Sequence, residues 1–226
     1  MDGLTEKEGA VAKKDVGVNL WALVMWCYRA VIVGFSGWYT WKALSDLNDW
    51  NVVVNFAYLT QVTNAAVLVY YLAWVVKALL NGARRTADYS AEIRGFVVML
   101  ASMVGLLFNT LLGPVDSWHS TVAHAIVPAL VVIDWLLFGG NQHRIRRWVP
   151  AAWLVPVLVY LGYYVWYSTS GGYAHPYPFL DPAASDFVEW IAILSVSFLT
   201  GAYLVYFVGK LISRVRVTRR STRHYS

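Results

Sequence analysis

Residues 118–139, WHSTVAHAIVPALVVIDWLLFG, form an almost uninterrupted apolar stretch that decides the fold of this chain. A helix rises about 1.5 Å per residue and the hydrocarbon layer of a bilayer is about 30 Å thick, so about 20 apolar residues cross it. His124 and Asp134 interrupt the apolar pattern. Because a buried imidazole or carboxyl group needs a polar partner, these two residues predict neighbouring helices that carry polar side chains.

Five further stretches of similar length and character accompany this one. The chain has 226 residues, and 58% of them belong to the hydrophobic types, well above the share in soluble domains. The sequence therefore predicts an all-α integral membrane protein, built as one bundle of six transmembrane helices. The expected helices cover residues 20–44, 53–80, 93–113, 118–139, 147–168 and 187–212.

The charged residues predict how this bundle is oriented in the membrane. Basic side chains gather in the second-to-third connection, the fourth-to-fifth connection and the C-terminal tail: Arg84, Arg85 and Arg94; Arg144, Arg146 and Arg147; Lys210, Arg214, Arg216, Arg219, Arg220 and Arg223. Acidic side chains occupy the other side: Asp46, Asp49, Asp116, Asp181 and Asp186. Because loops rich in lysine and arginine stay in the cytoplasm, both termini are expected there.

The same pattern divides the chain into three parts. Residues 1–19 are expected to form a flexible cytoplasmic tail, residues 20–213 the six-helix domain, and residues 214–226 a basic cytoplasmic tail. Beside a membrane helix, a basic tail favours anionic lipid headgroups as its partner over nucleic acid.

Thr60 and His124 are the candidate catalytic residues. Both helices run inward from the outer face, which places Thr60 about 10 Å and His124 about 9 Å deep. A hydroxyl beside an imidazole at one depth is a nucleophile beside a base. Three side-chain amides near the same layer, on Gln61, Asn64 and Asn109, are candidate donors to an oxyanion or substrate, with Asn64 preferred.

A second polar pair is expected nearer the cytoplasm. Arg29 and Asp134 carry opposite charges inside apolar stretches, which indicates a structural ion pair. Asp134 lies about 15 Å along the helix from His124, too far to orient the imidazole. The third member of a triad would then come from the long connection, in which His175 and Asp181 are candidates.

Three segments resemble a known superfamily. They are YLTQVTN at 58–64, HAIVPALVVIDWLLF at 124–138 and HPYPFLDP at 175–182, in matching order and spacing. The superfamily joins bacterial six-helix membrane proteins of unassigned function with the eukaryotic androgen-induced and androgen-dependent membrane hydrolases. The eukaryotic members are threonine hydrolases of fatty acid esters of hydroxy fatty acids.

That resemblance implies a catalytic pair in this chain. It maps onto Thr60, which follows Tyr58 and Leu59, and onto His124, which precedes Pro128. Tyr58 is a further candidate for a supporting role. The asparagine after the threonine and the proline after the histidine are each displaced by one position from the eukaryotic pattern, so the chain is closer to the bacterial branch.

The resulting hypothesis is an intramembrane lipid-ester hydrolase that needs no cofactor. A non-catalytic lipid-binding scaffold and a small-molecule transporter stay open as alternatives, since a polar layer also lines substrate pathways. Thr60 could instead bond to the carbonyl four residues before it, and Thr63 is a rival nucleophile. No His, Cys or carboxylate cluster has the spacing of metal ligands, and the oligomeric state is left open.

Overall fold

The structure is a computed structural model that describes residues 2–47, 49–80, 90–113, 115–170 and 175–222. Side chains are described for residues 20–46, 49–80, 90–113, 115–170 and 175–215. Over these residues the regular elements are all helical. The predicted number of six apolar, membrane-length helices is confirmed, with spans at Leu20–Asp46, Leu59–Leu80, Ala91–Leu112, Trp118–Phe138, Val149–Thr169 and Phe187–Val215.

Several spans combine a long helix with a shorter helical turn. The first half of the chain contains α1 (Asp2–Lys42), η1 (Ala43–Leu47), α2 (Val52–Phe56), α3 (Leu59–Leu80), α4 (Ala91–Leu107) and η2 (Phe108–Leu112). The second half contains α5 (Trp118–Thr121), η3 (Val122–Ile126), α6 (Val127–Phe138), η4 (Gln142–Arg144), α7 (Val149–Ala152), α8 (Leu154–Thr169), η5 (Pro178–Leu180) and α9 (Phe187–Thr222). Of these, α2, η4 and η5 lie in the connections between spans.

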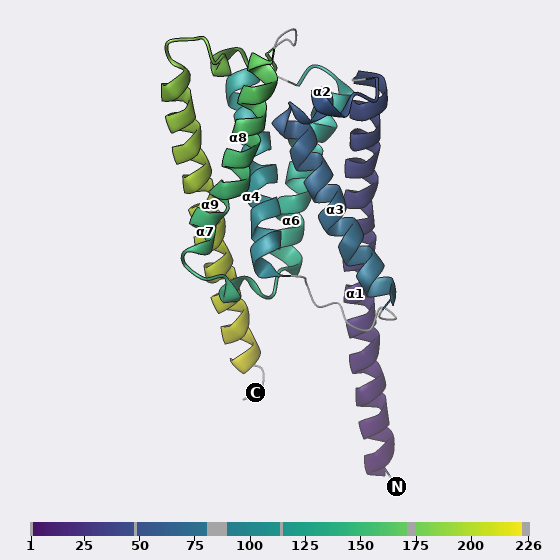
Figure 1. The fold of residues 1–226 in the computed structure, drawn as a ribbon. Coiled ribbons are helices and arrows are strands. Elements are labelled where there is room, and N and C mark those ends of the chain that lie inside the picture. Colours follow the sequence, from purple (N-terminus) through teal and green to yellow (C-terminus); the bar gives the residue numbers. More distant parts are fainter. Residues whose placement is uncertain (1, 48, 81–89, 114, 171–174, 223–226) are drawn as a thin grey trace.

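The helices form one bundle with α4 and α6 at its centre (Figure 1). Helices α1 and α3 pack together on one side, and α8 and α9 lie on the other. Both termini emerge at the same end, as an even number of spans requires (Figure 1). The connections that carry Asp46, Asp49, Asp116, Asp181 and Asp186 therefore lie at the opposite end, where α2 also lies (Figure 1).

The two terminal segments differ from the expected tails. Helix α1 begins at Asp2 and α9 continues to Thr222, so both helices extend through parts expected to be separate from the bundle. Residues 1–19 contain alanine, glutamate and lysine, which are good helix formers, and the adjoining span supplies a helix that they can extend. Most of the tail arginines and both Arg84 and Arg85 lie outside the residues whose side chains are described.

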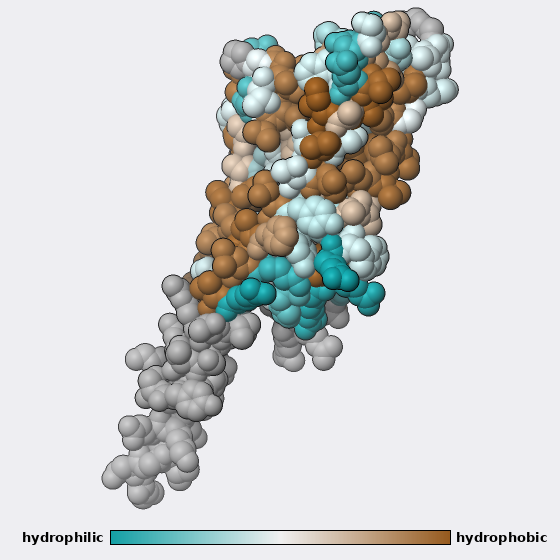
Figure 2. Space-filling model, turned by 90° about the vertical axis from the view of Figure 1, so that its left-hand side faces the viewer, coloured by the Kyte–Doolittle hydropathy of each residue, from teal (hydrophilic) through white to brown (hydrophobic). Residues whose placement is uncertain are grey.

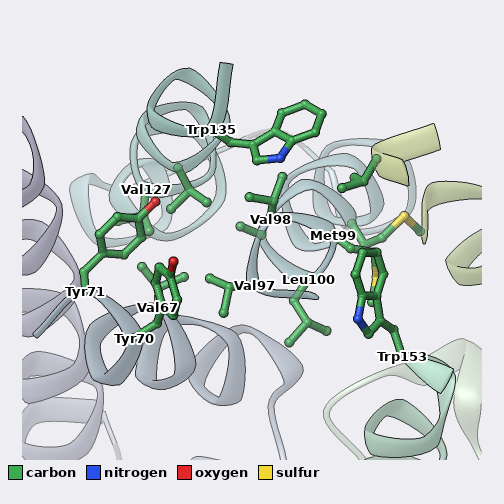
Figure 3. Packing of buried hydrophobic residues seen from close by; sticks show 14 of the residues in the cluster. Val67, Tyr70, Tyr71, Val97, Val98, Met99, Leu100, Val127, Trp135 and Trp153 are labelled. Atoms are coloured by element: carbon green, nitrogen blue, oxygen red, sulfur yellow. The ribbon is translucent and has the colours of Figure 1, made fainter. Parts of the chain in front are cut away.

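The core surrounds α4, which is buried on all sides along its middle (Figure 3). Val97, Val98, Met99 and Leu100 are each at most 4% exposed and pack against side chains of α3, α6 and α7. The neighbours labelled there are Val67, Tyr70 and Tyr71 from α3, Val127 and Trp135 from α6, and Trp153 from the end of α7. In a bilayer such contacts stabilise the bundle by dispersion and close fit, because the lipid is as apolar as the side chains.

The outer surface of the spans is apolar as well. Figure 2 shows a broad hydrophobic surface between a more polar region at the top and a polar region at the lower end of the bundle. Large side chains such as Val159, Val196 and Phe207 are more than half exposed. A continuous apolar surface of this kind is suited to contact with lipid chains and not with water.

A buried ionic cluster connects four helices, α1, α3, α4 and α6, in the half of the bundle nearer the termini. The predicted pair is present, with Arg29 Nε 2.8 Å from Asp134 Oδ1. Arg94 Nη2 lies 2.5 Å from Asp134 Oδ2, and the Tyr71 hydroxyl donates to the same oxygen at 2.9 Å. The guanidinium group of Arg29 also lies over the ring of Trp74, 4.2 Å from its centre.

The position of Arg94 corrects the expectation that it belongs to a basic connection. Ser90 caps α4 by accepting a hydrogen bond from the Glu92 N–H at 3.2 Å, so the helix begins before the expected residue 93. Arg94 is then in the first turn of α4, facing the bundle, and only 1% exposed. Its charge therefore takes part in the buried ionic cluster. Arg94 is not one of the exposed basic residues from which the orientation of the bundle in the membrane is predicted.

Candidate active site

Thr60 and His124 meet in the half of the bundle that is farther from the two termini. The Thr60 Oγ1 atom lies 3.1 Å from His124 Nε2, which is a hydrogen-bond distance. Thr60 is the second residue of α3, and His124 lies in the middle of η3. The proximity predicted from helix depth is thus present, and the hydroxyl faces the imidazole of another helix.

The other side of the imidazole is held by its own helix. His124 Nδ1 lies 3.0 Å from the carbonyl oxygen of Ser120. Because a carbonyl oxygen can only accept, Nδ1 carries the proton and the lone pair of Nε2 faces the Thr60 hydroxyl. The Ser120 hydroxyl lies 3.3 Å from the same nitrogen. A backbone carbonyl therefore orients this imidazole, as a carboxylate does in many hydrolases.

His175 and Asp181 are not the orienting groups that the sequence suggested. His175 Nε2 lies 3.8 Å from Asp181 Oδ1, and both side chains are more than one third exposed. They belong to the connection between α8 and α9, residues 170–186, which is called the outer connection below. The orienting position beside His124 Nδ1 is occupied by Ser120. The sequence already contains the signal for this contact, because Ser120 lies four residues before His124 and residues four apart share a face of a helix.

Pro128 and Gly105 explain the local shape of the helix that carries His124. Proline has no N–H, so Pro128 cannot bond to the carbonyl four residues before it, which is that of His124. The backbone forms a wider π-helical turn here, with the Val127 N–H bonded to the carbonyl of Val122. Helix α4 approaches closely at Gly105, where a Cβ atom would lie 3.2 Å from the His124 carbonyl oxygen.

None of the three predicted amides lines the pocket beside Thr60. Asn64 Nδ2 donates to the Thr60 carbonyl at 2.9 Å, and Asn109 Nδ2 donates to the Gly105 carbonyl at 2.7 Å. Gln61 is buried and does not line the pocket described below. Asn64 and Asn109 thus bond to the backbone around the site in this structure, and a role of the three amides as oxyanion donors stays a prediction.

Thr63, the rival nucleophile, is also turned away from the pocket. It is only 2% exposed, and its hydroxyl has no hydrogen-bond partner within the described part of the chain. Among the threonines of α3, the structure brings Thr60 to the imidazole and leaves Thr63 inside the bundle. Of these two threonines, Thr60 is therefore the one placed beside the imidazole and the pocket.

An apolar pocket adjoins Thr60. It encloses about 820 Å³ of empty space, including the part open to the surroundings, between the start of α3, η2, α8, the outer connection and α9. Its polar lining side chains are Thr60, Tyr160, Tyr177 and Ser195; the apolar ones include Leu107, Phe108, Leu154, Val157, Phe179, Leu180, Leu194 and Phe198. The Thr60 hydroxyl is therefore presented at the wall of an apolar pocket.

The lining of the pocket reaches the apolar surface of the bundle. Two of its lining side chains, Leu158 and Leu112, are 50% and 40% exposed. The pocket is therefore bordered by side chains that also belong to the exposed apolar surface.

The segment before Thr60 is shaped by tyrosine hydroxyl groups. One continuous helix was expected over residues 53–80, but the chain breaks between α2 and α3 at Ala57 and Tyr58. The Tyr160 hydroxyl donates to the Ala57 carbonyl at 2.7 Å, and the Tyr177 hydroxyl oxygen accepts from the Leu59 N–H at 2.8 Å. These bonds satisfy backbone groups that a continuous helix would have paired, so the break costs little.

Sequence reasoning did not find these tyrosines as parts of the site. Tyr177 lies in the segment HPYPFLDP and is buried, whereas Tyr58 contacts its ring edge-on at 6.5 Å between ring centres. Tyr58 thus supports Tyr177 and not Thr60 directly. Among the described residues, no group of three or more His, Cys, Asp or Glu side chains could hold a metal ion.

No model of a protein family, no curated protein and no solved structure matches this chain. The resemblance of its three segments to the threonine hydrolases therefore stays a prediction. What the chain can do is inferred below from the site's geometry, in which a hydroxyl, an oriented imidazole and an apolar pocket adjoin one another.

Proposed function

We propose that this protein is an intramembrane hydrolase of lipid esters, with Thr60 as the nucleophile and His124 as the general base. The observation that carries the proposal is the 3.1 Å contact between Thr60 Oγ1 and His124 Nε2 at the wall of an apolar pocket. A threonine hydroxyl becomes a useful nucleophile when a positioned base removes its proton. The tautomer fixed by Ser120 leaves Nε2 ready to accept that proton.

The reaction has two halves. Thr60 Oγ1 attacks the ester carbonyl carbon while His124 Nε2 takes the hydroxyl proton, which forms a tetrahedral intermediate. Collapse breaks the carbon–oxygen bond to the alcohol, and His124 returns its proton to that leaving oxygen. Water, deprotonated by His124, then attacks the acyl-threonine, and release of the fatty acid restores the Thr60 hydroxyl.

The pocket favours a substrate with a long apolar chain. Leu154, Val157 and Phe198 line the part of the pocket that is nearer the membrane centre than Thr60. An acyl chain in the pocket would therefore extend from the ester toward the membrane centre. Each buried methylene group contributes about 0.8 kcal/mol relative to water. Fatty acid esters of hydroxy fatty acids, or related esters, fit this chemistry, and the sequence resemblance supports the same class.

The proposal includes an orientation in the membrane. Arg144, Arg146 and Arg147 are exposed at the end where both termini lie, and acidic side chains such as Asp46 and Asp186 are exposed at the other end. With the basic end in the cytoplasm, the site lies in the outer leaflet. The basic tail would then contact anionic headgroups of the inner leaflet.

A lipid-binding scaffold is the second candidate, and one observation favours it. The pocket is lined almost entirely by apolar side chains, which by itself requires only that a lipid binds. A scaffold or a transporter would bind the same esters but would leave them intact and would form no covalent bond to Thr60.

The test compares ester hydrolysis by purified protein with that of single variants. Thr60→Ala and His124→Ala are expected to abolish turnover, whereas Thr110→Ala should retain it, because the Thr110 hydroxyl bonds to its own helix at Leu106. Thr63→Ala should also retain turnover. Unchanged hydrolysis in the first two variants would overturn the assignment, and binding without hydrolysis in all of them would favour the scaffold.

A further inference from the structure

An acyl-transfer site needs hydrogen-bond donors aimed at the oxygen that becomes negatively charged. None of the three amides predicted for this task lines the pocket, and those of Asn64 and Asn109 bond to the backbone. The donors that do border the pocket beside Thr60 come from the start of α3 and from the outer connection.

The first turn of α3 directs its N–H groups toward its own N-terminal end. Two of the first four bond to the carbonyl of Tyr58, at 3.1 and 3.2 Å, and the N–H of Leu59 donates to the Tyr177 hydroxyl oxygen at 2.8 Å. Within the described residues, the structure gives the N–H of Thr60 no acceptor. This N–H belongs to the residue that carries the nucleophile, and Thr60 lines the pocket.

Tyr177 places a second donor beside it. Successive N–H groups of one helical turn are neighbours, so a hydroxyl bonded to the N–H of Leu59 lies next to the N–H of Thr60. The Tyr177 oxygen accepts from Leu59, which leaves its own proton to donate. In the resting structure it is hydrogen-bonded with Tyr160, whose hydroxyl donates to the Ala57 carbonyl.

The Tyr177 proton can turn from Tyr160 to a stronger acceptor. A negatively charged oxygen accepts a shorter and stronger hydrogen bond than a neutral phenol does. The O–H bond reorients by rotation about the bond between ring and oxygen, without movement of the ring. The ring is fixed by contacts with Tyr164 and Phe179 and is only 9% exposed.

We infer that the Tyr177 hydroxyl and the backbone N–H of Thr60 together form the oxyanion site of this enzyme. The inference rests on the proposed hydrolase function and assigns Tyr177 as a further catalytic residue. Burial raises the pKa of Tyr177 to about 12, so the phenol keeps the proton that it must donate over the whole physiological range. The break between α2 and α3 leaves the Thr60 N–H available in this arrangement. In a continuous helix this N–H would bond to the backbone carbonyl four residues before it.

The experiment is the hydrolysis of a lipid ester by the full chain in lipid nanodiscs, with Tyr177→Phe as the variant and Tyr163→Phe as the matched control. Both changes remove one hydroxyl bonded to the backbone of the segment before Thr60, since Tyr163 donates to the Val53 carbonyl at 2.6 Å. Tyr163 does not line the pocket. Tyr177→Phe is expected to lower kcat about 100-fold with KM unchanged, as loss of one oxyanion donor does. The control is expected to keep the wild-type kcat.

A rise in KM together with the fall in kcat, or equal losses of kcat in both variants, would mean a structural role for Tyr177 and would overturn the inference. If Tyr177→Phe does not fold, Tyr177→difluorotyrosine keeps the shape and makes the phenol a stronger donor; kcat should then rise, and an unchanged kcat would overturn the inference. Wild-type protein that hydrolyses no ester would remove the proposed function itself. Wild-type activity that depends on Thr60 but not on Tyr177 would remove the inference alone.

Discussion

Replacing Asp134 with alanine should destabilise the bundle strongly while leaving the reacting pair in place. The Asp134 side chain is fully buried and binds Arg29, Arg94 and Tyr71, each from a different helix. Removal of one partner from a buried ion pair costs about 3–5 kcal/mol, because the remaining charge is left in a medium of low dielectric constant. Here two guanidinium groups lose the same carboxylate, so the upper part of that range is expected.

The assay is reversible unfolding of purified protein in mixed micelles, followed by circular dichroism as the denaturing detergent fraction rises. Asp134→Asn is the matched control, because its amide oxygen still accepts one of the hydrogen bonds but carries no charge; it should lose less stability than Asp134→Ala. Asp134 lies ten residues after His124, about 15 Å along the helix, so ester hydrolysis by the folded fraction should persist. A loss below about 1 kcal/mol in Asp134→Ala, the range of an exposed ion pair, would refute the reasoning.

Two further outcomes are expected around the site. Pro128→Ala restores an N–H group that can bond to the His124 carbonyl, which should tighten the π-helical turn and move the imidazole. We expect kcat to fall by up to about 100-fold without loss of stability. A wild-type kcat in this variant would show that the turn does not position His124. For Tyr177, whose pKa is raised to about 12, the folded state holds its proton more tightly than the unfolded state, so stability should be constant below about pH 10 and fall between about pH 10 and 12. Unfolding measured over that range should show a smaller fall in Tyr177→Phe, and an identical fall would exclude this residue as a cause.

The sequence was sufficient for the features that depend on length and hydropathy. The third span was expected at 93–113 and lies at Ala91–Leu112, and the fourth was expected at 118–139 and lies at Trp118–Phe138. Polar residues at matching depths also met as expected, since Thr60 contacts His124 and Arg29 contacts Asp134. The depth of a residue in the membrane depends on the rise per residue of its helix. It can therefore be calculated from the position of the residue in the sequence.

The features that depend on direction around a helix could not be predicted in this way. Asn64 lies at the right depth, yet its amide bonds to the backbone of its own helix. The break at Ala57 contains no proline or glycine and is produced by hydroxyl groups of Tyr160 and Tyr177, distant in sequence. Ser120 acts through its carbonyl, a group that every residue has and that no side-chain pattern marks.

The measurement that tests the central claim most directly is the search for an acyl group on Thr60. The protein is incubated with a lipid ester, quenched with acid and digested, and the peptide that contains Thr60 is examined by mass spectrometry. We predict that the mass of the acyl chain is found on Thr60, that it accumulates before the fatty acid is released, and that it is absent in His124→Ala. Ester hydrolysis without any adduct on Thr60, or an adduct on Thr63 instead, would contradict the assignment of the nucleophile.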